Sequence, residues 1–512
     1  MNRKFSEATR GAMVFSSRLP YDLSENPLSR RVRELRAAGM PLLDLTLSNP
    51  TRAEFHFPEE EISAAFAEAD ASRYEPHPRG LLPAREAIAM YYREDLGEAT
   101  RSGALKRAEA SDDEESAGKA TGNSPVPLAD VAAARTDGLR VDPKHLHCTA
   151  SSSEAYSMLF KLLCDPGDEI CIPLPAYPLF SWLAALDAVT VRTYNLRLAP
   201  DGRWHIDMHS LDMAISARTR AVIVVNPSNP AANYLRPAEF AQLDSLCARN
   251  RIALITDEVF WDFPLVNFVG GEKGAGIPED EGRNGGIENG IGGAERSEGK
   301  ESGIGGAERS EGKENGNGGA ERSEGKGKNS GGIAIERQRT AGIPGEALRF
   351  TINGLSKLLA LPQMKLGWIL TEGAAALRDD ALARLDVISD AYLSVGTPVM
   401  AAAQALLQLR EGIQAQIRSR CLRNLHAAAE ILGEHSTGGP LLPPEGGWSA
   451  VIALPDGADE EAIALRLLEE ERVLVHPGYL FDFARGKYLV VSLLCEESRF
   501  AEGIRKLSGH VS

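Results

Sequence analysis

The feature that most limits how this chain can fold is a series of short, continuously apolar segments that alternate with helix-like segments. Clear examples are residues 168–175 (DEICIPLP), 218–227 (RTRAVIVVNP) and 251–260 (RIALITDEVF). Residues 151–165 and 236–250 lie between them and have the apolar spacing of amphipathic helices. Strands without polar alternation are buried on both faces, which favours a mostly parallel sheet between helices. The sequence therefore predicts an α/β fold.

The same alternation continues toward the C-terminus. A long helical region is expected over 376–433, and after it GGWSAVIALP, ERVLVHPG and KYLVVSLL alternate with helices. This pattern predicts a second, smaller α/β domain. Further strands of the first domain are expected at 145–150, 189–196, 347–354 and 365–372.

Two segments interrupt the globular pattern. Residues 101–136 are mostly small and charged, and residues 270–345 are dominated by Gly, Glu, Lys, Arg, Ser and Asn, with GGAERSEGK repeated three times. Such segments bury too little apolar surface to offset their chain entropy. We expect disordered insertions in surface loops, which cost little stability because loop-closure entropy grows slowly with length. A tethering role is the alternative.

Composition and charge exclude several classes of function. The 512 residues are 43% hydrophobic and 25% charged, which suits two or more globular domains. The formal net charge of −16 argues against nucleic-acid or membrane partners. The N-terminus lacks the apolar core of a signal peptide, and the chain has no apolar run of about 20 residues. We expect a cytoplasmic protein.

The six cysteines form no CxxC pair, and most lie in apolar runs. This predicts buried free thiols in a reducing compartment. A disulfide or metal framework is the alternative, and no metal site is predicted.

In parallel α/β sheets, ligands bind at the carboxyl ends of the strands, where several polar residues of this chain are expected. Ser151, Ser152 and Ser153 stand at a strand-to-helix junction, where free backbone N–H groups and hydroxyls suit a phosphate. A plain serine N-cap is the alternative. Asn229 lies between two prolines after another strand and could donate to a ligand oxygen, or simply form a turn.

Two charged residues also follow predicted strands. A carboxylate at Asp257, at the end of an apolar strand, needs a partner such as a protonated ring nitrogen, although a helix cap or an ion pair would also serve. Lys357, in TINGLSKLLALPQMKLGW (351–368), could be a nucleophile or base with a lowered pKa, or one more surface charge.

The order and spacing of these motifs resemble the class I/II aminotransferases, which are pyridoxal-phosphate enzymes of fold type I. Asn229 and Asp257 are 28 residues apart, as in that family, and the distance from Asp257 to Lys357 becomes plausible when the repetitive insertion is set aside. The resemblance covers nearly all the chain outside the two insertions. It is carried by LLDLTLSNPT, RYEPHPRGLLPAREAIAMYY, TASSSEA, DPGDEICIPLPAYPLF, VVNPSNP, TDEVF, LSKLLALPQMKLGW and EGGW.

The resemblance implies a role for each matching residue. Lys357 would bond covalently to pyridoxal phosphate and then move the substrate's Cα proton. Asp257 would hold the ring nitrogen protonated, Asn229 would bind O3′ and Tyr177 would stack on the ring. The phosphate would be held by Ser151, Ser152, Ser153 and Lys365, with Tyr74 reaching it from a second subunit of a homodimer with shared active sites.

Three departures from the family pattern stand out. Lys365 replaces an arginine that grips the phosphate with two nitrogens, so its hold is weaker. Phe260 replaces a tyrosine that donates a hydrogen bond to O3′ in the family. The imine formed between Lys357 and the cofactor should therefore have a different pKa from that in relatives with tyrosine. Val490 replaces the arginine that binds the substrate's α-carboxylate, and we expect Arg52 or Arg485 to serve instead. Ala231 and Ala232 also replace a Thr-Gly pair, which affects the shape of their loop.

The resemblance implies a large domain with a mostly parallel seven-stranded sheet between helices and a smaller C-terminal α/β domain. The expected division is an N-terminal arm (1–45) that joins the small domain, the large cofactor-binding domain (46–375) and the small domain (376–512). The implied reaction is a ping-pong exchange of the amino group between an L-amino acid and a 2-oxo acid, as part of amino acid metabolism.

Other functions remain open on the same scaffold because fold does not fix reaction type. The main alternative is a carbon–sulfur β-lyase or another Cα-directed pyridoxal-phosphate enzyme. A regulator that binds the cofactor is a remote alternative, since the chain is acidic and only 41 residues precede Leu42. A pseudo-enzyme is disfavoured by the presence of Lys357, Asp257 and Asn229 together.

Overall fold

The computed structural model describes residues 16–19, 24–94, 141–266, 337–393, 395–433 and 439–511. The predicted insertion at 101–136 and most of the one at 270–345 lie outside these residues. Within them, no helix is both long and apolar enough to cross a membrane.

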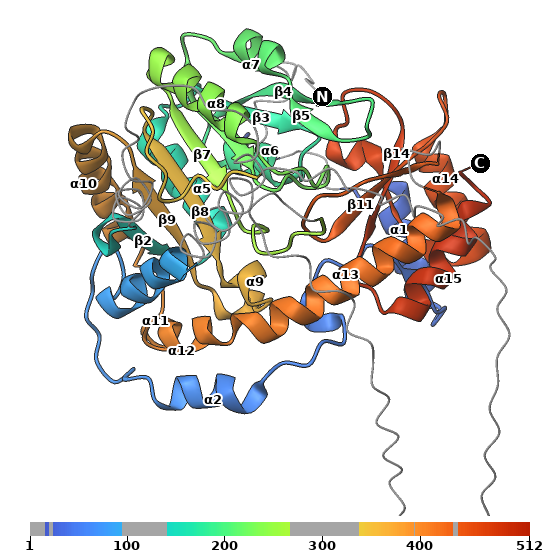
Figure 1. The fold of residues 1–512 in the computed structure, drawn as a ribbon, viewed down its shortest axis with the longest axis horizontal. Helices are drawn as coiled ribbons and strands as arrows, with labels where there is room; N and C mark the ends of the chain where they lie inside the picture. The colour runs from blue at the N-terminus through green and yellow to red at the C-terminus, as the bar shows by residue number, and fades with distance from the viewer. Residues whose placement is uncertain are drawn as a thin grey trace, which may run out of the picture. The chain divides into compact units, whose positions relative to one another are not determined.

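The main sheet has eight strands in the order β2-β9-β8-β7-β6-β3-β4-β5 (Figure 1). The five strands from β8 to β4 are mutually parallel, whereas β9 is antiparallel to β2 and β8, and β5 is antiparallel to β4. The bounds are β2 Leu146–Thr149, β3 Glu169–Leu174, β4 Thr190–Leu198, β5 Trp204–Ile206, β6 Thr219–Val225, β7 Ala253–Asp257, β8 Arg349–Gly354 and β9 Gly367–Glu372.

The α/β fold with a mostly parallel sheet is confirmed, but the count of seven strands was wrong by one. The additional strand in the described sheet is β5, which has only three residues and pairs with the edge of β4. Three residues are too few to show a strand periodicity, so this strand could not be recognised in the sequence.

The uninterrupted apolar strands supply two cores, one on each face of the sheet. Ile170 and Ile172 of β3 pack into one core, and Cys171 between them packs into the other. The first core is covered by α5 (Ser152–Leu163), α6 (Leu179–Leu186) and α10 (Ala375–Tyr392). The second is covered by α7 (Met208–Ala214) and α8 (Pro237–Asn250).

A second sheet, β10-β11-β14-β13, is built from the C-terminal part of the chain. A third, two-stranded sheet joins β1 (Leu43–Asp44) in parallel to β12 (Val473–Leu474), which brings the N-terminal segment to the C-terminal part. The division into domains remains a prediction. The bounds are β10 Leu441–Leu442, β11 Ser449–Ala453, β13 His476–Pro477 and β14 Tyr488–Ser492.

The other helices pack around these sheets. The long helix α13 (Arg410–Leu432) shares a core with α15 (Glu497–Ser508), α14 (Glu460–Arg466) and α1 (Pro27–Ala37). A further core brings a helix at 82–94 together with the remaining helices. These are α2 (Glu59–Ala67), α11 (Thr397–Ala401) and α12 (Ala403–Gln408).

The predicted insertion at 270–345 extends too far. Residues 337–345 are placed, and Arg339 and Thr340 are buried at 3% and 0% exposure. Their side chains bind Glu258, whose buried carboxylate needs partners. Residues 337–345 fall within the predicted insertion because their polar and small side chains resemble its composition. Arg339 and Thr340 among them nevertheless form a buried polar contact.

Candidate active site

The carboxyl ends of β6, β7 and β8 lie together at one edge of the main sheet. Val225 pairs with Asp257, and Asp257 pairs with Ile352. Backbone bonds continue beyond the strands, since Asn226 N donates to Asp257 O at 2.8 Å and Glu258 N donates to Ile352 O at 2.9 Å. Asn229, Asp257 and Lys357 therefore lie at or just after the ends of three adjacent strands.

Asp257 is a buried carboxylate held in a fixed orientation. Its Oδ2 accepts from the hydroxyl of Tyr156 at 2.9 Å, and its Oδ1 accepts from the backbone N–H of Val259 at 3.1 Å. Burial raises the pKa of Asp257 to about 6, although both hydrogen bonds and the Lys357 charge act to lower it. A carboxylate in this setting is suited to a cationic ligand group.

Lys357 lies in the short helix α9 (Leu355–Leu358), directly after β8. Burial lowers the pKa of its amine, and the charge of Asp257 acts in the opposite direction. The amine lies 5.6 Å from the centre of the Phe260 ring and 5.1 Å from the centre of the Trp448 ring. A lysine with a lowered pKa beside a carboxylate can act as a nucleophile and as a base.

The serine cluster begins α5 at the end of β2. Ser151 is the N-cap and its Oγ accepts from Glu154 N at 3.1 Å, so the capping alternative describes this residue. Ser152 and Ser153 occupy the first helical positions, and their hydroxyls have no hydrogen-bond partner among the described residues. The hydroxyls of Ser152 and Ser153 are therefore free donors at the N-terminus of α5, a helix of twelve residues.

A close approach between β8 and β9 joins this end of the site to Lys357. A methyl group on Gly354 would lie 2.8 Å from the Cα of Gly367, and one on Gly367 would lie 3.3 Å from the backbone of Ser151. Lys365 precedes Gly367 by two residues, has a left-handed backbone with φ of 55° and is exposed. The serine cluster and Lys365 therefore flank the same strand start.

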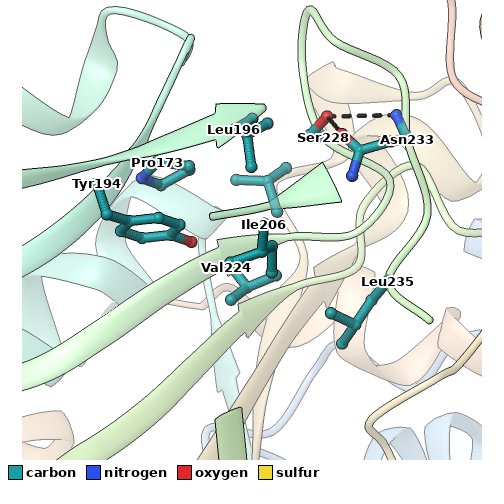
Figure 2. A pocket seen from close by; sticks show the side chains of 9 residues that line it. Pro173, Tyr194, Leu196, Ile206, Val224, Ser228, Asn233 and Leu235 are labelled. Carbon is teal, nitrogen blue, oxygen red and sulfur yellow. Dashed lines mark hydrogen bonds between the residues drawn. The ribbon is translucent and has the colours of Figure 1, made fainter. Parts of the chain in front are cut away.

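The loop that carries Asn229 is fixed by its neighbours. Ser228 and Asn233 are joined by hydrogen bonds, as Figure 2 shows. The adjoining apolar cavity has a volume of 10 Å³, which is enough for about one water and excludes a substrate. Ala232 has a left-handed φ of 59°, the conformation that favours the glycine missing at this position. Asn229 itself is half-buried.

The other predicted residues are exposed. Tyr177 and Tyr74 are 51% and 69% exposed, which leaves both rings free for a ligand or a second chain. Arg485 is exposed in the segment before β14, and Val490 is buried within β14. No contact among the described residues brings Arg485 to Lys357 or Asp257.

Arg52 lines a cavity of 440 Å³ together with Arg36, Asp44 and Arg499. Neither Lys357 nor Asp257 contributes to this cavity. The structure thus places one predicted cation in a polar cavity but does not join it to the reactive lysine.

Sequence reasoning missed three contacts of this site. Tyr156 lies one turn into α5, where its aromatic ring looked like an ordinary core residue. Trp448 belongs to the EGGW segment, which was recognised only as part of the resemblance. The pair of Glu258 and Arg339 was missed because Arg339 lay within the expected insertion.

Comparisons with known proteins add a family to this geometry. Residues 124–268 match the family described as aminotransferase class I and II. Human tyrosine aminotransferase is 30% identical over 122 residues, which are 24% of this chain and 26% of that protein. The glutamate-pyruvate aminotransferase AlaA of Haemophilus influenzae is 19% identical over 96% of each chain. An S-alkyl-thiohydroximate lyase of Arabidopsis thaliana is 27% identical over 133 residues.

These alignments differ in length. With human tyrosine aminotransferase and other relatives of about 30% identity, the aligned part spans about a quarter of the relative's length. Among solved structures, an aminotransferase from Escherichia coli has a TM-score of 0.66 and 17% identity, and the match covers 98% of this chain and 100% of that one. This similarity establishes the fold.

Enzymes of this family and fold use pyridoxal phosphate, and the residues present here fit that cofactor. Lys357 is a half-buried amine for its aldehyde carbon, Asp257 is a buried carboxylate for its ring nitrogen, and the free hydroxyls of Ser152 and Ser153 suit its phosphate. The absence of a Cβ at Gly354 and Gly367 keeps these groups close. Residues 124–268 of the chain thus match the aminotransferase class I and II family, and the chain shares its fold with solved aminotransferases.

Proposed function

We propose that this protein is a pyridoxal-phosphate-dependent aminotransferase that exchanges an amino group between an L-amino acid and a 2-oxo acid by a ping-pong mechanism. The observation that carries the proposal is the half-buried amine of Lys357, which interacts electrostatically with the buried carboxylate of Asp257 at the adjacent strand end. The chain's similarity to alanine, tyrosine and glutamate-pyruvate aminotransferases supports it.

The bound cofactor supplies an electron sink that acidifies the proton on the substrate's Cα. Asp257 would hold the ring nitrogen of the cofactor protonated, since its carboxylate is buried and fixed by the hydroxyl of Tyr156. With the cofactor bound, Lys357 would take up and release the proton of the substrate's Cα, which a neutral amine can do when its pKa is lowered by burial.

The remaining predicted residues position the cofactor in this proposal. Ser151, Ser152, Ser153 and Lys365 surround the phosphate, Asn229 donates to O3′ and Tyr177 stacks on the ring. Tyr74 of the partner subunit reaches the phosphate in a homodimer with shared active sites. The exposure of Tyr74, Leu82 and Met90 supports an unpartnered surface in the single chain. Equilibrium sedimentation tests the dimer, and a monomer at micromolar concentration would contradict it.

The test of cofactor attachment uses purified apoprotein and pyridoxal phosphate. Lys357→Ala should abolish covalent attachment, measured by mass spectrometry after borohydride reduction. Lys144→Ala changes an exposed lysine elsewhere and should leave attachment intact. Attachment that survives Lys357→Ala would refute the assignment of this lysine.

The principal alternative is a carbon–sulfur β-lyase, which the apolar residue at Val490 and the similarity to a lyase favour. Adding an amino acid without an oxo acid separates the two reactions. A transaminase converts its cofactor stoichiometrically to the pyridoxamine form. A lyase releases pyruvate and ammonia and leaves its cofactor in the aldehyde form. A panel of donors, with small apolar amino acids such as alanine as first choices, identifies the substrate.

Arg52 and Arg485 are the proposed cations for the substrate carboxylate. Replacement of the one that binds it by alanine should raise the KM for the donor about 10- to 100-fold, since a charged hydrogen bond contributes about 1.5–3 kcal/mol. Arg249→Ala, an exposed arginine paired with Asp212, is the control. Unchanged KM in both variants would remove both candidates.

A cytoplasmic location is part of the proposal. All six cysteines are free thiols, as expected for proteins in a reducing compartment. Fractionation of cells that express the protein tests this location, and recovery from a membrane or secreted fraction would contradict it.

A further inference from the structure

Two aromatic rings face the amine of Lys357 from different parts of the chain. Phe260 follows β7 by three residues, and Trp448 directly precedes β11. The amine lies 5.6 Å from the first ring centre and 5.1 Å from the second, within the range of cation–π contacts. The rings themselves meet edge to face, with centres 5.2 Å apart and planes at 79°. They form a corner around the amine.

The amine has few other partners. Among the described residues it makes no hydrogen bond or ion pair within bonding distance, and Asp257 is the charged group that acts on it. Gln414 of α13 approaches the same helix but donates to the backbone oxygen of Leu358 at 3.0 Å and carries no charge. Glu445, near Trp448, is occupied by Arg236 and by the N–H of Tyr234. The rings therefore supply much of the contact that holds the amine.

Trp448 is held rigidly in this position. Its carbonyl oxygen accepts from Leu493 N at 2.7 Å, and the N–H of the preceding Gly447 donates to Phe263 O at 2.9 Å. Pro264 and Gly446 form a β-bridge beside it. The Phe263 ring packs against Trp448 with ring centres 5.0 Å apart. The indole is 5% exposed. A ring whose backbone is hydrogen-bonded on both sides and which packs against Phe263 can orient a flexible lysine at low entropic cost.

We infer that Trp448 and Phe260 are positioning residues that hold the Lys357 ammonium through cation–π contacts and direct the amine for its covalent bond with the cofactor. The inference rests on the proposed function of Lys357. In the step concerned, the neutral amine adds to the cofactor aldehyde and one water leaves, so a C–N double bond replaces the C–O double bond. The rings favour the charged amine before the step and set its direction during it.

The experiment follows the loading of pyridoxal phosphate onto apoprotein by absorbance across pH. The midpoint of the rate profile reports the protonation of Lys357, and the plateau at high pH reports the alignment of the neutral amine. Trp448→Leu should lower the midpoint by about one pH unit, the effect of losing one partly buried cation–π contact. It should also lower the plateau about 3- to 10-fold. Trp448→Phe keeps a ring and should restore most of both values.

The matched control is Trp204→Leu. Trp204 is also buried, at 6% exposure, but it packs against Tyr488 and Phe483, in a different core. Both substitutions remove a large buried ring, so a loss that reflects stability alone would occur in both variants. Trp204→Leu should leave the midpoint and the plateau at their wild-type values.

Two results distinguish this inference from the proposed function. If Lys357→Ala still loads the cofactor covalently, the function of Lys357 is refuted. If that variant fails to load but Trp448→Leu and Phe260→Leu keep the wild-type midpoint and plateau, only the role of the rings is overturned. Equal shifts in Trp448→Leu and Trp204→Leu would also overturn it, because a remote change of packing would then suffice.

Discussion

Replacing Arg339 by methionine should destabilise the protein by about 3–5 kcal/mol, because it would leave the charge of Glu258 buried without its cation. The two side chains are 3% and 0% exposed, and Arg339 Nε lies 3.0 Å from Glu258 Oε2. The same guanidinium donates to the Tyr91 hydroxyl at 2.7 Å and lies 4.5 Å from the centre of the Tyr92 ring. Methionine replaces part of its volume but none of its charge.

Glu258 would keep some support in this variant. Its Oε1 accepts from Thr340 N at 2.7 Å and from Thr340 Oγ1 at 2.9 Å. A double variant with Glu258→Gln removes the stranded charge, so it should be less unstable than the sum of the single variants. Urea unfolding of the apoprotein measures each change. In Arg339→Met the pKa of Asp257 should rise further, because the charge of Glu258 already raises it and would no longer be balanced by Arg339.

Arg249→Met is the comparison for this prediction. Its pair with Asp212 has a similar distance of 3.3 Å, but the side chains are 59% and 62% exposed. Exposed pairs contribute about 0–1 kcal/mol, so this variant should be nearly as stable as the wild type. If Arg339→Met costs no more than Arg249→Met, burial does not govern the strength of the pair and the argument fails.

Three further predictions concern the site and its supports. Burial raises the pKa of Asp257 to about 6, so ionising this carboxyl in the folded protein lowers the free energy of unfolding as pH rises from about 4 to about 6. Asp257→Asn apoprotein lacks this loss and should gain up to about 3 kcal/mol of stability over wild type across that window. A difference in stability between the two proteins that stays constant with pH, measured by urea unfolding, would contradict this. Ala232→Gly should stabilise the protein by about 0.5 kcal/mol, because glycine adopts the left-handed backbone of this position without strain. Ala231 has no positive φ, so Ala231→Gly should destabilise the protein by about 0.5–1 kcal/mol. Equal shifts of the thermal unfolding midpoint in the two variants would refute the role of the backbone. Gly354→Ala should destabilise the protein by about 1–3 kcal/mol and weaken cofactor binding in a fluorescence titration, because its methyl group would collide with Gly367. Gly412→Ala places its methyl group in open space and should be neutral or stabilising. Equal cofactor affinity in both variants would exclude a tight contact at Gly354.

The sequence was sufficient for seven of the eight strands of the main sheet and for predicting that Lys357 and Asp257 follow neighbouring strands. Asp257 ends a continuous apolar run and Lys357 follows the next predicted strand, and the carboxyl ends of parallel strands meet at one edge, so their proximity follows from a local pattern. The order of motifs also led to the cofactor, because lysine, aspartate and asparagine follow one another at characteristic positions.

Contacts between distant segments could not be read in this way. The hydrogen bond from Tyr156 to Asp257 joins residues 101 positions apart, and the packing of Trp448 on Lys357 depends on how the C-terminal segment folds back. An aromatic residue carries no signal that separates a core position from one beside a reactive amine. Arg339 was hidden for a different reason, since its neighbours in sequence have the composition of a linker.

The contacts of Arg337 have a consequence for the repetitive part of the chain. The described chain stops at residue 266 and resumes at 337, and the guanidinium of Arg337 lies 4.4 Å from the centre of the Trp261 ring and donates to Trp261 O at 3.2 Å. Gln338 O accepts from Asn226 at 2.9 Å, so the returning chain is anchored at once. The described residues on either side of positions 267–336 are thus held close to each other by the contacts of Arg337 with Trp261. Because loop-closure entropy changes little with length, this position can gain or lose repeats over evolutionary time while the geometry around Lys357 stays the same.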